Sequence, residues 1–226
     1  MLRAIVFDFD GVIANSEPLH LRAFQDVLQE EGVALAQAEY YDRYLGYDDF
    51  GVFRAVGADR GKGWGDDQVA GFVKRKAVQL EDLERGVSIL FPGADAAIRR
   101  AAARAPLAIA SGALGAEIRR VLDQAGLADC FQAIVAAEDT RASKPAPDPY
   151  LRAVALLSSR ATTPLQPRSC VALEDSRWGL ESARKAGLRT VGVAQTYDAA
   201  ALGEADLVIP SLDRLDIDAL DRLCAD

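Results

Sequence analysis

The chain has 226 residues, a formal net charge of −8 and a sequence pI near 4.8, and 50% of its residues are hydrophobic. This length and composition fit one large domain, or a core with a smaller domain, that buries a sizeable hydrophobic core. The acidic balance argues against a nucleic-acid partner, which would need a basic surface. We also expect no membrane segment and no signal peptide, because no apolar run could span a bilayer and the chain enters a strand at once.

The cysteines, Cys130, Cys170 and Cys224, are odd in number and have no paired spacing. We interpret them as buried free thiols of a reducing compartment and expect a cytoplasmic protein. A metal or redox role for these thiols is the alternative.

The first element is predicted to be a strand that is covered on both faces. Residues 4–7 ("AIVF") are continuously apolar, as in the parallel strands of α/β folds. Asp8 and Asp10 follow two positions apart, so their side chains point to the same side if the strand persists. Neighbouring carboxylates repel each other and are costly to bury alone, so the sequence predicts a positive group beside them.

A segment from about residue 16 to 85 shows no convincing strand and is predicted to be helical. Ser16 is expected to cap a first helix that ends at Gly32. Further helices are predicted over 36–45 and 66–78, with the glycine-rich residues 57–67 ("GADRGKGWGDD") as the loop between them.

From Pro92 onward, predicted strands alternate with predicted helices. The strands cover 106–111, 131–136, 169–175, 189–194 and 205–209, and the helices cover 94–105, 114–125, 148–158, 177–186 and 213–224. This alternation implies right-handed crossovers, so the fold class is α/β with a doubly wound, Rossmann-like parallel sheet. We therefore expect an α/β core domain of residues 1–15 and 86–226, and a small helical cap domain of residues 16–85 inserted after the first strand.

Polar residues follow the strands at the edge where open α/β sheets bind ligands. In chain order they are Asp8 and Asp10 after the first strand, Ser111 and Gly112 after the second, Lys144 after the third, and Glu174 and Asp175 at the end of the fourth. The carboxyl ends of parallel strands share one edge. We therefore expect acids, a hydroxyl and a lysine to converge there.

Such a set suits phosphoryl transfer through an aspartyl-phosphate. A carboxylate nucleophile is repelled by its phosphate target, since two like charges about 4 Å apart cost about 4 kcal/mol at an effective dielectric near 20. A Mg²⁺ ion between Asp8 and Asp175 would cancel much of this repulsion. Lys144 and Ser111 would hold phosphoryl oxygens. Asp10 would protonate the leaving alkoxide and then take a proton from water.

Four segments, "DFDGV", "ASG", "SKPAPDPY" and "LEDSRWGLESARKAG", resemble in order the four motifs of the haloacid dehalogenase-like hydrolase superfamily. "DGVIANSEPLH" resembles its β-phosphoglucomutase-like branch, and the helical insert resembles the helical cap of that superfamily. The resemblance implies that Asp8 is the nucleophile and Asp10 the general acid/base. It further implies Mg²⁺ ligands at Asp8, Asp175, Glu174 and the Asp10 carbonyl, and phosphate contacts at Ser111, Gly112 and Lys144.

These assignments have structural alternatives. The two aspartates could form a turn, Ser111 could be an ordinary strand-end residue, and Lys144 could be a solvated surface lysine. Pro145 favours extended backbone at Lys144, which suits a fixed aim into the site. Glu174 and Asp175 could also merely favour the dipole of the following helix.

In the predicted cap, His20 is the only histidine of the chain. The resemblance implies that it helps near the acid/base and the substrate, and a partly exposed helix residue is the alternative. Four tyrosines, Tyr40, Tyr41, Tyr44 and Tyr47, lie close together. We expect them to pack inside the cap rather than to line a substrate pocket.

The function predicted from these residues is a Mg²⁺-dependent phosphatase acting on a small phosphorylated metabolite, such as a sugar phosphate or a phosphoglycolate-like compound. A sugar-phosphate mutase of the β-phosphoglucomutase type is the alternative. In that branch a cap arginine holds the second phosphate, and alignment at Gly46 leaves Asp49 at its position, which would repel a bisphosphate. Arg43, Arg54 and Lys76 are cations that could substitute.

Three other classes fit less well. A 2-haloacid dehalogenase needs neither Asp10 nor a metal at Asp175, and a phosphorylatable receiver module would lack the cap. A binding protein without activity is disfavoured because every expected catalytic position is filled. The sequence leaves the substrate and the oligomeric state open, with a monomer favoured slightly over an oligomer.

Overall fold

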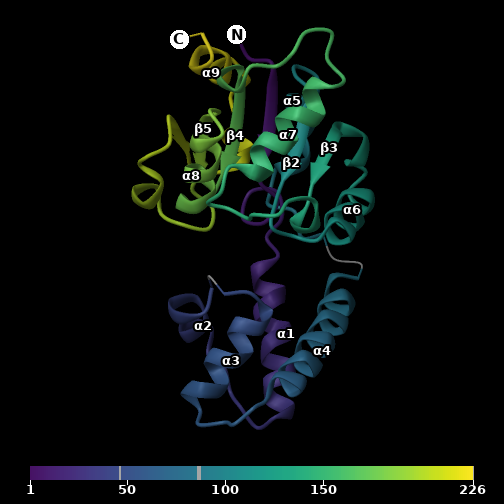
Figure 1. The fold of residues 1–226 in the computed structure, drawn as a ribbon, viewed down its shortest axis with the longest axis vertical. Coiled ribbons are helices and arrows are strands. Elements are labelled where there is room, and N and C mark those ends of the chain that lie inside the picture. The colour runs from purple at the N-terminus through teal and green to yellow at the C-terminus, as the bar shows by residue number, and fades with distance from the viewer. Residues whose placement is uncertain (46, 86–87, 226) are drawn as a thin grey trace. The chain divides into compact units, whose positions relative to one another are not determined.

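The computed structural model describes residues 1–45, 47–85 and 88–225, which form two compact units. One unit consists of Met1–Asn15 and Ser88–Asp226, and the other of Ser16–Val87. Figure 1 shows the first unit as a sheet flanked by helices and the second as a group of helices.

The α/β unit is built on a six-stranded parallel sheet in the order β3-β2-β1-β4-β5-β6 (Figure 1). The strands are β1 (Ala4–Phe7), β2 (Leu107–Ala110), β3 (Phe131–Val135), β4 (Cys170–Glu174), β5 (Arg189–Val193) and β6 (Leu207–Ile209). Ile5 is paired with Leu107 of β2 on one side and with Val171 of β4 on the other. The order of the strands therefore runs in opposite directions from β1, towards β3 on one side and towards β6 on the other. In open α/β sheets, ligands bind at such a switch point.

Alternation along β1 divides its apolar side chains between two faces of the sheet. Ala4 and Val6 pack in a buried cluster with Tyr150 of α7 (Asp148–Ser158). Phe7 points to the other face, where its ring meets Phe131 edge-on at a centroid distance of 5.9 Å. The helices α5 (Ala94–Ala102), α6 (Gly115–Gln124), α8 (Arg177–Lys185) and α9 (Ile217–Leu223) complete this unit, together with single 3₁₀ turns.

The helical unit contains α1 (Glu17–Glu30), α2 (Gln37–Arg43), α3 (Asp49–Asp59) and α4 (Asp66–Glu84). Apolar residues on all of these helices form one buried cluster, which includes Phe24, Phe53 and Phe72. Tyr40 and Tyr44 are part of this cluster, so their predicted packing is confirmed, whereas Tyr47 is 55% exposed.

The predicted fold class is confirmed by the parallel sheet and its alternating helices. The prediction missed α3 and wrongly assigned residues 57–59 to a loop, whereas the predicted helix start at Asp66 is confirmed as the first residue of α4. Two glycines in α3 lower its helix propensity. Gly57 is there for packing, because a Cβ at this position would lie 2.6 Å from Cε3 of Trp64.

Smaller differences concern helix ends and caps. Helix α4 continues to Glu84 instead of ending near residue 78, and the closing helix α9 begins at Ile217 after a 3₁₀ turn. Ser16 occupies the N-cap position of α1, but its side chain makes no capping hydrogen bond. The Gly46 alignment lies outside the described residues.

The cysteines are free thiols, as predicted, but only Cys170 is fully buried, while Cys130 and Cys224 are half-buried. Across residues 1–45, 47–85 and 88–225, the structure contains no helix with both the length and the apolar character needed to cross a membrane.

Candidate active site

Asp8 lies directly after the central strand of the sheet. Its backbone N–H donates to the carbonyl of Leu173 at 2.9 Å, so the pairing with β4 continues to this residue. The chain then leaves the sheet in a tight turn, in which the N–H of Gly11 donates to Ala14. Strand β1 thus does not persist through Asp10, which lies half-buried in this turn. Asp8 itself remains at the sheet edge, and the residue is 8% exposed.

Lys144 supplies the positive group that the sequence predicted beside the first aspartate. Its Nζ lies 2.8 Å from Oδ1 of Asp8 and 2.6 Å from Oε1 of Glu174. The N–H of Phe9 also donates to Asp8 Oδ1 at 2.7 Å, and these two donors together fix the orientation of the carboxylate. Lys144 is therefore not a solvated surface lysine.

The loop that carries Lys144 is tied to the neighbouring helix α8. Ser182, which is fully buried on α8, donates from its hydroxyl to the carbonyl of Ala146 at 2.5 Å. The Lys144–Pro145 peptide bond in this loop is cis. The lysine is thus presented by backbone that is attached to the helix after β4.

Three buried carboxylates meet beside this lysine. Oxygen atoms of Asp8, Glu174 and Asp175 lie within 4.8 Å of one another. Gly11 makes room for one of them, because a Cβ there would lie 1.9 Å from Oδ2 of Asp175. Gly179 does the same for Glu174, with its carboxylate oxygens 1.9 and 2.0 Å from a Cβ at that position.

The charges of this cluster perturb one another. Burial, and then the negative charge of Asp8, raise the pKa of Asp175 to about 8. The same causes in the same order raise the pKa of Glu174. Burial alone would lower the pKa of Lys144, but the Asp8 and Glu174 carboxylates outweigh it and raise that pKa above its ordinary value. One lysine faces three carboxylates, so the cluster suits a further cation.

The donor set also indicates which cation would fit. Asp8, Glu174 and Asp175 offer only oxygen ligands, with no thiolate or imidazole among them. Hard oxygen ligands suit Mg²⁺, Ca²⁺ or Mn²⁺ rather than Zn²⁺. The arrangement can therefore hold a hard divalent ion next to a carboxylate whose orientation is fixed by hydrogen bonds.

Ser111 and Gly112 follow β2, which pairs directly with β1. Ser111 is 3% exposed, and its Oγ accepts a hydrogen bond from the N–H of Ala113 at 3.1 Å. Gly112 is exposed, and a Cβ there would meet no atom within 4 Å. Both residues therefore lie at the same sheet edge as Asp8. Their binding of phosphate stays a prediction.

In the helical unit, His20 belongs to a polar cluster around a buried lysine. Lys76 is 2% exposed, and its Nζ lies 2.9 Å from Nδ1 of His20 and 2.9 Å from Oδ1 of Asp49. A lysine ammonium can only donate, so Nδ1 of His20 is the acceptor in this contact. The role of His20 near the acid/base stays a prediction.

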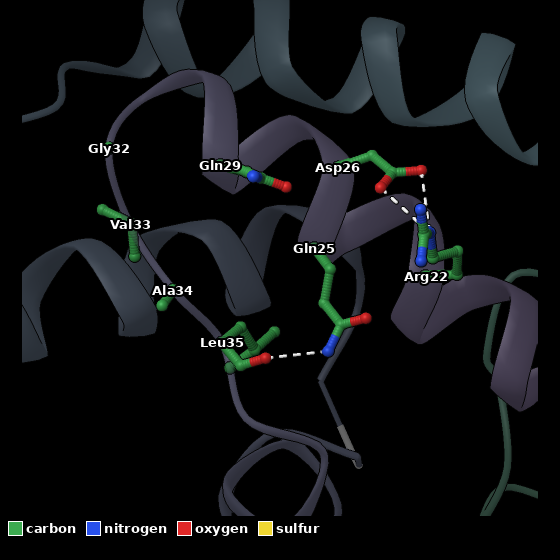
Figure 2. A pocket seen from close by; sticks show the side chains of 8 residues that line it. All are labelled: Arg22, Gln25, Asp26, Gln29, Gly32, Val33, Ala34 and Leu35. Atoms are coloured by element: carbon green, nitrogen blue, oxygen red, sulfur yellow. Dashed lines mark hydrogen bonds and ion pairs between the residues drawn. The ribbon is translucent and has the colours of Figure 1, made fainter.

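The helical unit also carries a surface pocket of about 460 Å³, which Figure 2 shows from close by. Its lining comes from the end of α1 and the loop after it: Arg22, Gln25, Asp26, Gln29, Gly32, Val33, Ala34 and Leu35. Arg22 is paired with Asp26 at 3.0 Å, and Gln25 donates to the Leu35 carbonyl at 2.8 Å. None of the predicted site residues lines this pocket.

Several residues without a role predicted from the sequence shape the carboxylate cluster. Tyr150 donates from its hydroxyl to Glu174, and Thr196 makes a hydrogen bond to Asp175. Gly11 and Gly179 provide the space described above. Tyr150 is the last residue of the quoted segment "SKPAPDPY". Its place in the same short segment as Lys144 was the sequence signal that could have indicated a role in the site.

Comparison with known proteins gives a consistent result. Residues 5–193 match the family described as haloacid dehalogenase-like hydrolase. The protein CbbY of Rhodobacter capsulatus is 33% identical over 98% of this chain and 99% of its own length. The fructose-1-phosphate phosphatase YqaB of Escherichia coli K12 is 28% identical over 84% of this chain and 95% of its own length.

A solved structure of Rhodobacter sphaeroides CbbY in complex with xylulose 1,5-bisphosphate superposes with a TM-score of 0.80 at 26% identity. The match covers 98% of this chain and all of the other. Together with the match over residues 5–193, these similarities establish that the chain belongs to the haloacid dehalogenase-like hydrolase family.

Proposed function

We propose that the chain is a Mg²⁺-dependent phosphatase that hydrolyses a small phosphomonoester through a phosphorylated Asp8. The observation that carries the proposal is the 2.8 Å contact between Lys144 Nζ and Asp8 Oδ1 within a group of three buried carboxylates. A carboxylate that attacks a phosphate dianion needs fixed positive charge around the phosphoryl oxygens. The phosphatase name of the YqaB relative agrees with this chemistry.

In the first step, a carboxylate oxygen of Asp8 attacks phosphorus, and the bond between phosphorus and the ester oxygen breaks. The departing alkoxide takes a proton from Asp10 and leaves as the free alcohol. In the second step, Asp10 takes a proton from water, whose oxygen attacks phosphorus. The bond to Asp8 then breaks, which releases inorganic phosphate and returns both aspartates to their starting states.

The remaining residues hold the phosphoryl group in this proposal. Lys144 lies beside Asp8 and offers its ammonium group to one phosphoryl oxygen. Ser111 and the backbone of Gly112, at the end of the neighbouring strand, offer donors to the others. Such donors act where negative charge develops in the transition state.

Asp8 and Asp175 would hold Mg²⁺, together with Glu174 and the backbone carbonyl of Asp10. When bound, the ion would cancel charge on the carboxylates and the phosphoryl oxygens. The support for this assignment is the cluster itself, which gathers three buried carboxylates around one lysine. The alternative in which Glu174 and Asp175 serve only the dipole of α8 does not account for their closeness to Asp8.

The α/β unit carries the chemistry in this proposal, and the helical unit selects the leaving group. The charges of the helical unit favour a substrate with a single phosphate. Each cation that could replace the missing arginine is paired with a carboxylate: Arg43 with Asp59 at 2.7 Å, Arg54 with Asp66 at 2.8 Å, and Lys76 with Asp49 at 2.9 Å. A second phosphate would therefore gain little net attraction.

Two alternatives remain for the substrate and the reaction. The first is a mutase of the β-phosphoglucomutase type, which must retain a bisphosphate intermediate. The second is hydrolysis of a bisphosphate such as xylulose 1,5-bisphosphate, which the R. sphaeroides CbbY structure contains. The ion pair between Lys76 and Asp49 disfavours both, because the buried lysine of the helical unit already has a carboxylate partner. We therefore propose hydrolysis of the monophosphate of a neutral sugar or polyol.

Phosphorus NMR tests this function. The purified protein is incubated with Mg²⁺ and a panel of sugar and polyol monophosphates, and separately with β-glucose 1-phosphate and a trace of glucose 1,6-bisphosphate. We expect inorganic phosphate from at least one monophosphate and no net isomerisation. Accumulation of glucose 6-phosphate without matching inorganic phosphate would show that the chain is a mutase.

A further inference from the structure

Tyr150 is a tyrosine whose hydroxyl reaches the carboxylate cluster. It lies in the first turn of α7 and is fully buried. Its hydroxyl donates to Oε1 of Glu174 at 2.6 Å. The ring packs with apolar residues of the sheet, among them Val6 and Ala172, so core packing fixes the position of the hydroxyl.

Glu174 is held from both of its oxygens. Oε1 accepts hydrogen bonds from Tyr150 and from Lys144 Nζ, both at 2.6 Å. Oε2 lies 3.3 Å from the hydroxyl of Ser176, the N-cap residue of α8. Of the two short contacts on this carboxylate, the one from Lys144 comes from a charged group and the one from Tyr150 comes from a neutral group. The Tyr150 donor lies in the hydrophobic core.

The same tyrosine also lies next to Lys144. The lysine Nζ is 5.3 Å from the centroid of the Tyr150 ring, which is the range of a cation–π contact. Tyr150 therefore touches both ends of the Lys144–Glu174 ion pair. Because Lys144 also contacts Asp8 at 2.8 Å, the tyrosine is linked to the nucleophile through one lysine.

We propose that Tyr150 is a positioning residue that holds Glu174, and through it Lys144, in the arrangement that binds Mg²⁺. The inference rests on the proposed function, in which Asp8, Glu174 and Asp175 hold the ion. Groups that orient metal ligands in this way typically change metal affinity or activity by about 10–100-fold when removed. Tyr150→Phe removes only the hydroxyl and leaves the packed ring in place.

The test is a Mg²⁺ titration that does not depend on activity. The thermal unfolding of wild type and Tyr150→Phe is followed at increasing Mg²⁺, and the dissociation constant is derived from the rise in unfolding temperature. We expect this constant to increase about tenfold or more in Tyr150→Phe. Tyr44→Phe is the matched control, because Tyr44 is also a buried tyrosine bonded to a carboxylate, Asp59, but in the helical unit.

A double-mutant cycle separates positioning from a general loss of structure. If Tyr150 acts through Glu174, Tyr150→Phe should have little further effect on the Mg²⁺ constant in a Glu174→Gln background. Added Mg²⁺ should also restore most of kcat in Tyr150→Phe, with KM for the phosphomonoester unchanged within about twofold. A merely structural defect would not be relieved in this way.

The outcomes distinguish the inference from the function on which it rests. A Mg²⁺ constant for Tyr150→Phe within twofold of wild type would overturn the positioning role and leave the phosphatase proposal intact. Equal effects of Tyr150→Phe in the wild-type and Glu174→Gln backgrounds would overturn it as well. A wild-type protein that binds no Mg²⁺ would overturn the proposed metal site, and the inference with it.

Discussion

Replacing Gly11 by alanine should lower Mg²⁺-dependent activity about 100-fold, whereas the same change at Gly32 should not. Both glycines have positive φ, +76° for Gly11 and +70° for Gly32, so alanine is strained at either position. Their surroundings differ. A Cβ at Gly11 would lie 1.9 Å from Oδ2 of Asp175 and 2.8 Å from Oγ1 of Thr196, while a Cβ at Gly32 meets nothing within 4 Å.

Both substitutions therefore carry the free-energy cost of a left-handed backbone, and only Gly11→Ala also brings the new Cβ into a steric clash. The left-handed backbone costs alanine about 1–2 kcal/mol at either site. At about 2–4 °C per kcal/mol for a chain of this size, both variants should unfold roughly 2–8 °C lower without Mg²⁺. Only in Gly11→Ala must the Asp175 carboxylate retreat, by about 1 Å, and a displacement of that size costs about 100-fold in rate.

Two measurements check this prediction. Thermal unfolding with and without Mg²⁺ should show that Gly32→Ala keeps the wild-type stabilisation by the ion and that Gly11→Ala loses most of it. The kcat/KM for a phosphomonoester at saturating Mg²⁺ should fall about 100-fold in Gly11→Ala alone. If Gly11→Ala matched Gly32→Ala in both measurements, the assignment of Asp175 to the metal site would be refuted.

Three further outcomes are expected. Asp10→Asn should fold normally but lower kcat about 10²–10⁴-fold, since one group serves both proton transfers; near-normal turnover would contradict its role. Lys144→Met should lower the unfolding free energy by about 3 kcal/mol, as for a broken buried ion pair, which chemical denaturation can measure; unchanged stability would show that its contacts with Asp8 and Glu174 contribute little. EDTA should stop hydrolysis and excess Mg²⁺ should restore it, and full activity in EDTA would exclude the metal.

The α/β unit was predictable because its signals are local. The run of residues 4–7 is apolar, as a central strand covered on both faces must be, and two of the later helices, α6 and α8, are followed by glycine, at Gly126 and Gly187. In the helical unit the same rules failed at α3. There the sequence shows two glycines, and the need for Gly57 against Trp64 becomes visible only in the folded packing.

The same distinction holds for the candidate site. Asp8, Lys144, Glu174 and Asp175 could be proposed from the sequence because each lies at the end of a strand of one parallel sheet or in the segment after it. The hydrogen bond between Tyr150 and Glu174 spans 24 residues, and the space that Gly11 leaves for Asp175 spans more than 160. Such contacts depend on which strands pair, and no local pattern in the chain encodes them.

The central claim is that Asp8 carries the phosphoryl group during turnover. The most direct measurement is an acid quench of the protein during hydrolysis of a phosphomonoester with Mg²⁺, followed by mass spectrometry of its peptides. We predict one phosphoryl group on the peptide that contains Asp8, and none in Asp8→Asn, which should also release no inorganic phosphate. A phosphoryl group on another residue, or steady phosphate release by Asp8→Asn, would contradict the mechanism.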